Sequence, residues 1–157
     1  MERPTQEVVD DFKQFYDATS FPEAQQAFSK VLKNLKIEPG RFPEFFSKLK
    51  GLLLPCLSYI HRSIWDVLET KSKCKVYQNG IASKYSVLVV GAGPCGLRTA
   101  IETQFLGAQT IIVEAREDFT RNNVLKLWKF LIEDLKSLGM KSFFPQFCNG
   151  DINHIRI

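Results

Sequence analysis

The chain has 157 residues, a formal net charge of +4, 45% hydrophobic residues and 24% charged residues. This length suits one domain with a real core, since domains commonly contain roughly 100 to 200 residues. The composition excludes a disordered chain. Lys and Arg are mixed with Asp and Glu throughout, so the sequence predicts no nucleic-acid partner.

The chain contains four cysteines, Cys56, Cys74, Cys95 and Cys148. None of them forms a CxxC pair, which argues for reduced thiols and against a metal site. Residues 1–10 have no apolar core of a secretory signal, and the most apolar stretch, 51–60, is far shorter than the roughly 20 residues of a membrane helix. We therefore expect a cytoplasmic protein with no metal and no membrane segment.

Apolar residues at helical spacing predict a first helix from about Thr5, a second from Ser20, and further helices over 42–54 and 57–68 with Pro55 between them. Ser20 and Glu23 have the spacing of a capping box. The polar stretch 71–86 is expected to be a linker or a short hairpin. The first 84 residues should thus form a helical layer.

After this segment the pattern changes. Residues 87–90 (VLVV) form a short apolar run that is typical of a strand buried on both faces of a parallel sheet. The glycine-rich sequence GAGPCG follows at 91–96, then a helix over 97–106 that Gly107 ends, and a second strand over 110–113.

The run 91–96 is a GxGxxG motif in the context that a dinucleotide-binding βαβ unit requires, between a strand and a helix. Gly91 permits the tight turn, Gly93 leaves room for a pyrophosphate to approach the backbone, and Gly96 lets helix and strand pack closely. The free N–H groups at the start of the helix favour a phosphate there.

Glu114 ends the second strand, where a carboxylate can accept hydrogen bonds from the ribose hydroxyls of adenosine. A carboxylate would also repel a 2′-phosphate, which disfavours NADP at this position. The alternative is that Glu114 is a surface residue at the end of a strand.

The sequence therefore predicts an α/β fold, with an N-terminal helical layer over 1–84 followed by the first βαβ unit of a Rossmann-like FAD- or NAD(P)-binding domain over 85–157. Two strands do not complete such a sheet, so we expect the fold to be incomplete and the chain truncated.

Several motifs beyond the glycines extend this prediction. They are GAGPCGLRTAIE at 91–102, EAR at 114–116, RNNVL at 121–125, LW at 127–128, DL at 134–135, LG at 138–139, FC at 147–148, Asp151 and HI at 154–155. Together they resemble the N-terminal monooxygenase domain of the MICAL family. Members of that family are flavoproteins that oxidise methionines of actin filaments with NADPH and oxygen and so promote filament disassembly.

The resemblance implies FAD as cofactor, NADPH as co-substrate, actin filaments as partner and an association with the cytoskeleton. It implies that Cys95 lies at the pyrophosphate turn and that Glu114, Ala115 and Arg116 line the adenosine end. Three further residues, Arg121, Asn122 and Asn123, would belong to the flavin side of the site. A guanidinium such as that of Arg121 also suits phosphate oxygens, although a solvated surface charge is the alternative.

No residue is predicted to be catalytic, because the flavin performs the chemistry. Cys95 and Cys148 are more simply a small residue in a turn and a semi-buried thiol. Since the chain is short, we expect it to bind FAD weakly or not at all. Two other functions stay open: a noncatalytic remnant that acts as an interaction module, and an NAD-binding domain.

Overall fold

The computed structural model of the chain describes residues 4–116, 124–140 and 154–156. Helices precede the strands along most of the chain, as expected. The elements are α1 (Gln6–Asp17), α2 (Phe21–Leu35), α3 (Phe42–Leu53), the 3-10 turn η1 (Leu54–Cys56), α4 (Tyr59–Ser72), β1 (Ser86–Val90), α5 (Pro94–Phe105), β2 (Gln109–Val113), β3 (Val124–Lys126), α6 (Lys129–Ser137) and β4 (His154–Arg156).

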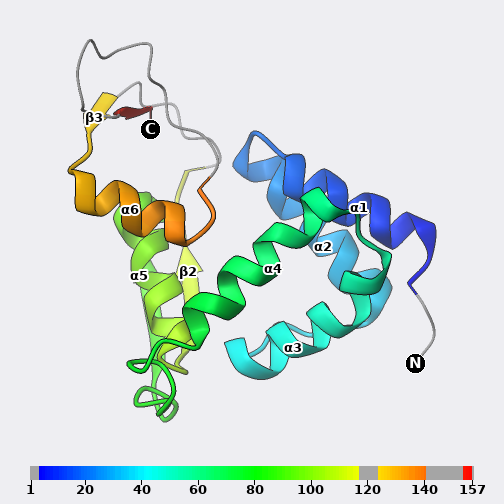
Figure 1. The fold of residues 1–157 in the computed structure, drawn as a ribbon, viewed down its shortest axis with the longest axis horizontal. Coiled ribbons are helices and arrows are strands. Elements are labelled where there is room, and N and C mark those ends of the chain that lie inside the picture. The colour runs from blue at the N-terminus through cyan, green and yellow to red at the C-terminus, as the bar shows by residue number, and fades with distance from the viewer. Residues whose placement is uncertain (1–3, 117–123, 141–153, 157) are drawn as a thin grey trace.

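Helices α1 to α4 lie together on one side of the molecule, and β2, α5 and α6 lie on the other (Figure 1). Helix α4 crosses from the first group toward the second. Several contacts join the groups. Among them, the Phe42 ring of α3 lies 4.7 Å from that of Phe105 in α5, and the Lys71 ammonium of α4 donates to Asp134 of α6 at 3.1 Å. The helical layer therefore packs directly on the strand-containing part.

The start of α2 confirms one of the two hydrogen bonds of the predicted capping box, while the second goes to the residue before the N-cap. The Ser20 hydroxyl accepts a hydrogen bond from the backbone N–H of Glu23 at 3.4 Å, and the Glu23 carboxylate accepts one from the N–H of Thr19 at 3.4 Å. Pro22 lies in the first turn, where its missing N–H is not needed. These local interactions determine where α2 begins and which side chains its first turn presents.

The main core belongs to the helical layer. Phe12 of α1 stacks on Trp65 of α4 with ring centroids 5.6 Å apart, and both are almost fully buried. The other members are Val8, Val9, Val31, Ile37, Leu49, Leu53 and Leu57. Helices α1 to α4 all contribute to this core, as apolar residues at helical spacing predict. Ile60, in the first turn of α4, is 66% exposed and does not belong to it.

Strands β1 and β2 pair in parallel, with Ser86 opposite Gln109 and Val90 opposite Val113. The two strands expected from the sequence are thus confirmed, and α5 lies between them in the chain. The expectation that β1 is buried on both faces is wrong for the described residues, because Val90 is 80% and Leu88 62% exposed. Among these residues each strand has only the other as its neighbour in the sheet.

A series of turns connects α4 to β1 over residues 73–85, so the expected linker forms without a hairpin. Gly80 has a positive φ of 52°, as the predicted turn requires. The Arg41 guanidinium donates to the backbone carbonyls of Ser83 and Gly107 and so ties the helical layer to this linker and to the end of α5. The remaining strands, β3 and β4, form a separate antiparallel pair.

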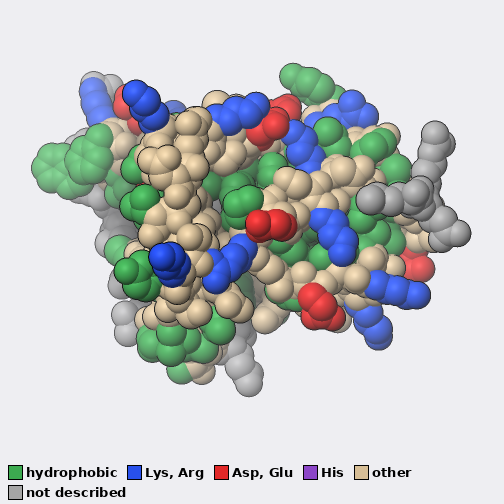
Figure 2. All heavy atoms as spheres, turned by 90° about the horizontal axis from the view of Figure 1, so that it is seen from below, with side chains coloured by type: hydrophobic (Ala, Val, Ile, Leu, Met, Phe, Trp, Pro, Cys, Tyr) green, Lys and Arg blue, Asp and Glu red, His purple; other side chains and the backbone are tan. Residues whose placement is uncertain are grey.

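No helix among the described residues is long and apolar enough to cross a membrane. On the face of the molecule shown in Figure 2, Lys and Arg side chains are spread out, with Asp and Glu among them. That face therefore presents no clustered basic patch.

Candidate functional site

The turn after β1 depends on Gly91. Its φ is +102°, in the left-handed region that favours glycine, and its N–H donates to the carbonyl of Val113 at 2.7 Å. The β1–β2 hydrogen bonding thereby continues one residue beyond β1, and the chain then turns sharply toward α5. The predicted role of Gly91 in a tight turn fits this geometry.

Gly96, in the first turn of α5, packs against the same turn. A Cβ at this position would overlap the carbonyl oxygen of Gly91 and lie 3.4 Å from a methyl carbon of Val89. Only a residue without a side chain lets α5 start this close to β1. This is the close packing of helix and strand that the motif predicts.

Gly93 differs from both. It occupies the N-cap position of α5 with an extended backbone (φ −69°, ψ 175°), and apart from its two chain neighbours no atom of the described residues lies within 4 Å of a Cβ built there. The space in front of the first turn of α5 is therefore open, and the exposed Cys95 lies in that turn. An anion could approach the helix start along this path and benefit from its free N–H groups and dipole.

Glu114, just beyond β2, forms hydrogen bonds both with the glycine-rich turn and with Arg116. Its carboxylate accepts hydrogen bonds from the backbone N–H of Ala92 at 2.8 Å, from the backbone N–H of Arg116 at 3.0 Å and from the Arg116 guanidinium at 2.9 and 3.2 Å. The side chain of Glu114 is only 9% exposed. The carboxylate thus joins the glycine-rich turn to the end of β2.

These donors all stabilise the ionised carboxylate. The Arg116 side chain contributes most, followed by the Ala92 N–H and the Arg116 N–H, and together they lower the pKa of Glu114 to about 2. Glu114 is therefore a permanent anion at neutral pH. It also has no unused position for another donor as long as the Arg116 guanidinium remains in place.

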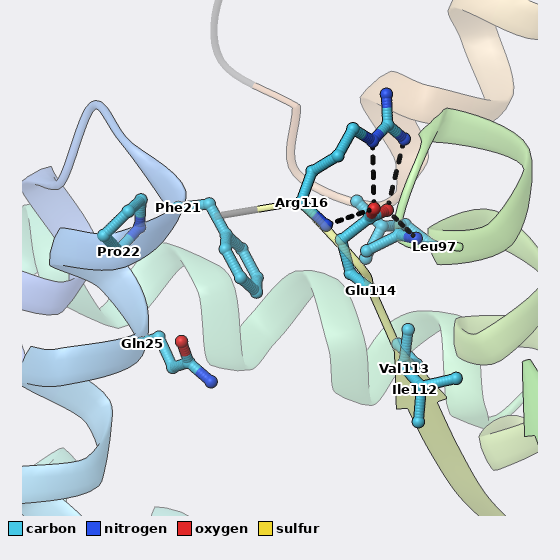
Figure 3. Close-up of a pocket in the computed structure, with 9 residues that line it drawn as sticks. Phe21, Pro22, Gln25, Leu97, Ile112, Val113, Glu114 and Arg116 are labelled. Carbon is cyan, nitrogen blue, oxygen red and sulfur yellow. Dashed lines mark hydrogen bonds and ion pairs between the residues drawn. The ribbon is translucent and has the colours of Figure 1, made fainter. Parts of the chain in front are cut away.

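An open cavity of about 610 Å³ lies beside this carboxylate. Figure 3 shows Glu114 and Arg116 on one side of it and side chains from the start of α2 on the other. Its volume is within the range of small-molecule sites, roughly 300 to 1,000 Å³. The lining residues are Phe21, Pro22, Gln25, Ala92, Leu97, Ile112, Val113, Glu114 and Arg116.

The structure brings several of the predicted site residues together and leaves others apart. Glu114 and Arg116 line the cavity, while Gly91, Gly93, Cys95 and Gly96 form the neighbouring turn and helix start. Ala115 is exposed and does not line the cavity. The remaining predicted residues, Arg121, Asn122 and Asn123, lie outside the described residues, as does Cys148.

Sequence reasoning missed the wall that α2 contributes. Phe21, Pro22 and Gln25 lie far from the glycine motif in the chain, and no local pattern connects them with it. The Trp128 side chain, part of the LW motif, is 74% exposed. Trp128 precedes α6, whose buried face comes from Ile132.

A second missed feature is a cluster of charged side chains between α4, α5 and α6. Arg98 of α5 donates to Asp134 at 2.6 and 3.3 Å and to Glu102 at 2.7 Å. Lys71 also donates to Asp134, and the hydroxyl of Tyr77 donates to Glu102 at 3.0 Å. Hydrogen bonding from Arg98 lowers the pKa of Asp134. These contacts hold α6 against α5.

Comparisons with known proteins agree with this geometry. A family profile described as an FAD binding domain matches residues 84–125, which contain the glycine turn, α5, β2 and Glu114. The chain is 43% identical over 93% of its length to the F-actin monooxygenase mical1 of Danio rerio, and 41% identical over 93% to the F-actin monooxygenase MICAL2 of Homo sapiens.

A third relative, the protein-methionine sulfoxide oxidase mical3b of Danio rerio, is 42% identical over the same 93%. The chain spans only 12%, 7% and 9% of the lengths of these three proteins, respectively. Over 93% of its own length, this chain is thus related in sequence to the MICAL family of monooxygenases.

Proposed function

We propose that this chain forms the N-terminal part of the FAD-binding domain of a MICAL-like monooxygenase, with a helical segment over 1–84 and the start of a Rossmann-like unit over 85–157. The order β1, α5, β2 with parallel strands supports this assignment. The observation that carries it is the bond between Glu114 and the Ala92 N–H, because it joins a ribose-binding type of carboxylate to a phosphate-binding type of turn.

The residues present fit an adenine dinucleotide. The space in front of Gly93 admits a pyrophosphate to the start of α5, with Cys95 in the first turn. The neighbouring cavity is large enough for an adenosine group. Residues of the glycine turn would hold the pyrophosphate, and Glu114 would hold the ribose.

Binding of the ribose would require an exchange of the hydrogen-bond donors to Glu114. The carboxylate of Glu114 now accepts two hydrogen bonds from the Arg116 guanidinium, and ribose hydroxyls would replace those donors. The Ala92 N–H donates from the opposite side and would keep the carboxylate in position. Arg116 would then line the adenosine end, as the family resemblance implies, together with Ala115.

By the same resemblance, Arg121, Asn122 and Asn123 belong to the flavin side. A bound FAD would supply the hydride and oxygen chemistry, and the protein's own residues would bind and orient it. We propose actin filaments as the partner, since two of the relatives are named F-actin monooxygenases. We also propose NADPH as the electron donor, which the family resemblance implies. We further propose a cytoplasmic location near the cytoskeleton. No described residue is assigned a catalytic role.

A second candidate function is that of an interaction module. It is favoured by the exposed apolar side chains of the two-stranded sheet, among them Leu88, Val90 and Ile111. Such exposed apolar side chains would allow the sheet to bind another polypeptide segment. An NAD-binding domain is the third possibility, and comparing FAD with NAD in one titration separates it from the first.

Equilibrium dialysis of the 157-residue chain against FAD tests the proposal, with the variant Gly93→Thr as the critical comparison. Threonine suits the extended backbone and the N-cap position, so the fold should be retained, while its side chain enters the open space in front of α5. We expect weak FAD binding by the wild type and none by the variant. Equal FAD binding by both proteins would contradict a pyrophosphate site at this turn.

A further inference from the structure

The cavity next to Glu114 is bounded by two parts of the chain that are distant in sequence. One wall comes from β2 and the residues after it, and the other from Phe21, Pro22 and Gln25 at the start of α2 (Figure 3). A ligand that reached Glu114 would therefore contact the helical layer as well. The helical layer thus forms one wall of this cavity.

The chemistry of the α2 wall suits a purine base. Phe21 is 38% exposed and offers an aromatic surface of the kind on which bases stack. The amide of Gln25 has one acceptor and two donor positions, which match the N6 amino group and the N7 acceptor of adenine. Across the cavity, Ile112 and Val113 of β2 provide apolar surface for the rest of the ring.

The start of α2 is well positioned for this task. Phe21 and Gln25 are separated by one helical turn, so their side chains lie on the same side of α2. The capping bonds of Ser20 and Glu23 hold this first turn, and the buried Ala27 and Val31 anchor the helix in the core. The two cavity-facing side chains are therefore presented by a rigid element.

We infer that Phe21 and Gln25 form the base-recognising wall of the nucleotide site, so that the helical layer selects adenine while the glycine turn and Glu114 hold the pyrophosphate and ribose. This inference rests on the proposed nucleotide site. It assigns base specificity to residues outside the segment of 84–125 that matches the FAD binding profile.

Calorimetric titration of the 157-residue chain with ADP and with GDP tests the inference. We expect the wild type to prefer ADP. The variant Gln25→Ala should lose about tenfold in ADP affinity, because both hydrogen bonds of the amide to the base are lost, and with them most of the preference over GDP. Phe21→Leu keeps an apolar side chain but removes the ring, and it should weaken both nucleotides.

Gln26→Ala is the matched control, because Gln26 is an exposed neighbour on α2 that does not line the cavity. It should bind both nucleotides like the wild type. Gln25 is exposed too, so its substitution leaves the core intact. If the wild type binds ADP and Gln25→Ala binds it equally well with the same preference, the inference is wrong and the nucleotide site stands. If the wild type binds neither ADP nor FAD, both proposals are wrong.

Discussion

The carboxylate of Glu114, just beyond β2, accepts a 2.8 Å hydrogen bond from the backbone N–H of Ala92 in the turn after β1. This bond holds the Glu114 carboxylate, which follows the neighbouring strand β2, next to the glycine-rich turn. The Arg116 guanidinium completes the arrangement from the solvent side. These donors hold the carboxylate as an anion.

Stability should depend on the ionisation of Glu114 in acid. Its pKa is about 2 in the folded chain and 4.5 ordinarily, so the ionised form favours folding. The stabilisation is fully present above the ordinary pKa and is lost as pH falls toward about 2. Urea unfolding of the wild type and Glu114→Gln should therefore give midpoints that converge as the pH is lowered through this window. A midpoint difference that is independent of pH would contradict this assignment.

The guanidinium of Arg116 is the largest cause of that low pKa. Replacing it in Arg116→Gln should raise the pKa of Glu114, while the Ala92 N–H keeps it below the ordinary 4.5. An NMR titration of the Glu114 side-chain carboxyl carbon measures the shift. Arg62→Gln is a suitable control, since the Arg62 side chain donates to the carbonyl of Leu57 in the helical layer. An unchanged Glu114 pKa in Arg116→Gln would show that the ion pair does not form in solution.

Two glycine substitutions should change stability in opposite directions. Gly96→Ala forces a Cβ against the Gly91 carbonyl, and we expect it to destabilise the chain by about 1 to 3 kcal/mol. Gly51 lies within α3, and a Cβ added there would have no described atom within 4 Å other than those of its own helix backbone and chain neighbours. Gly51→Ala should stabilise by about 0.5 to 1 kcal/mol through helix propensity. Chemical denaturation measures both, and a neutral Gly96→Ala would refute the close approach of α5 to β1.

The contact between α6 and α5 should depend on Asp134. Asp134→Asn removes a carboxylate that pairs with both Arg98 and Lys71, whose side chains are 28% and 19% exposed. We expect a loss of about 1 kcal/mol and faster hydrogen exchange of the α6 amides. Asp10→Asn breaks an exposed pair with Lys13 on α1 and should leave the α6 exchange rates unchanged. Equal α6 protection in Asp134→Asn and the wild type would show that this cluster does not hold the helix.

The parts of the structure that could be predicted are those determined by local sequence. The start of α2 follows from Ser20 and Glu23, the end of α5 from Gly107, and the turn after β1 from Gly91, because each depends on the conformation of a few consecutive residues. Glu114 could be placed at the site because it directly follows a strand that pairs with β1.

The other features depend on tertiary packing, which single-sequence patterns do not contain. The amino-acid sequence around Phe21 and Gln25 does not indicate that α2 faces the cavity beside Glu114. The apolar run 87–90 correctly indicates a strand, but its burial depends on neighbouring elements, and Val90 is exposed among the described residues. The periodicity of the sequence likewise does not predict that Arg98 pairs with Asp134 of α6.

The most direct test of a nucleotide site at the glycine turn is to titrate FAD with the 157-residue chain and to measure the fluorescence anisotropy of the flavin. ADP and FMN then serve as competitors. The glycine turn, Glu114 and the α2 wall would all hold the adenosine diphosphate half of the cofactor. We therefore predict a weak rise in anisotropy that ADP reverses and FMN does not. An anisotropy that stays flat at high protein concentration, or a rise that FMN reverses as effectively as ADP, would contradict a nucleotide site at this turn.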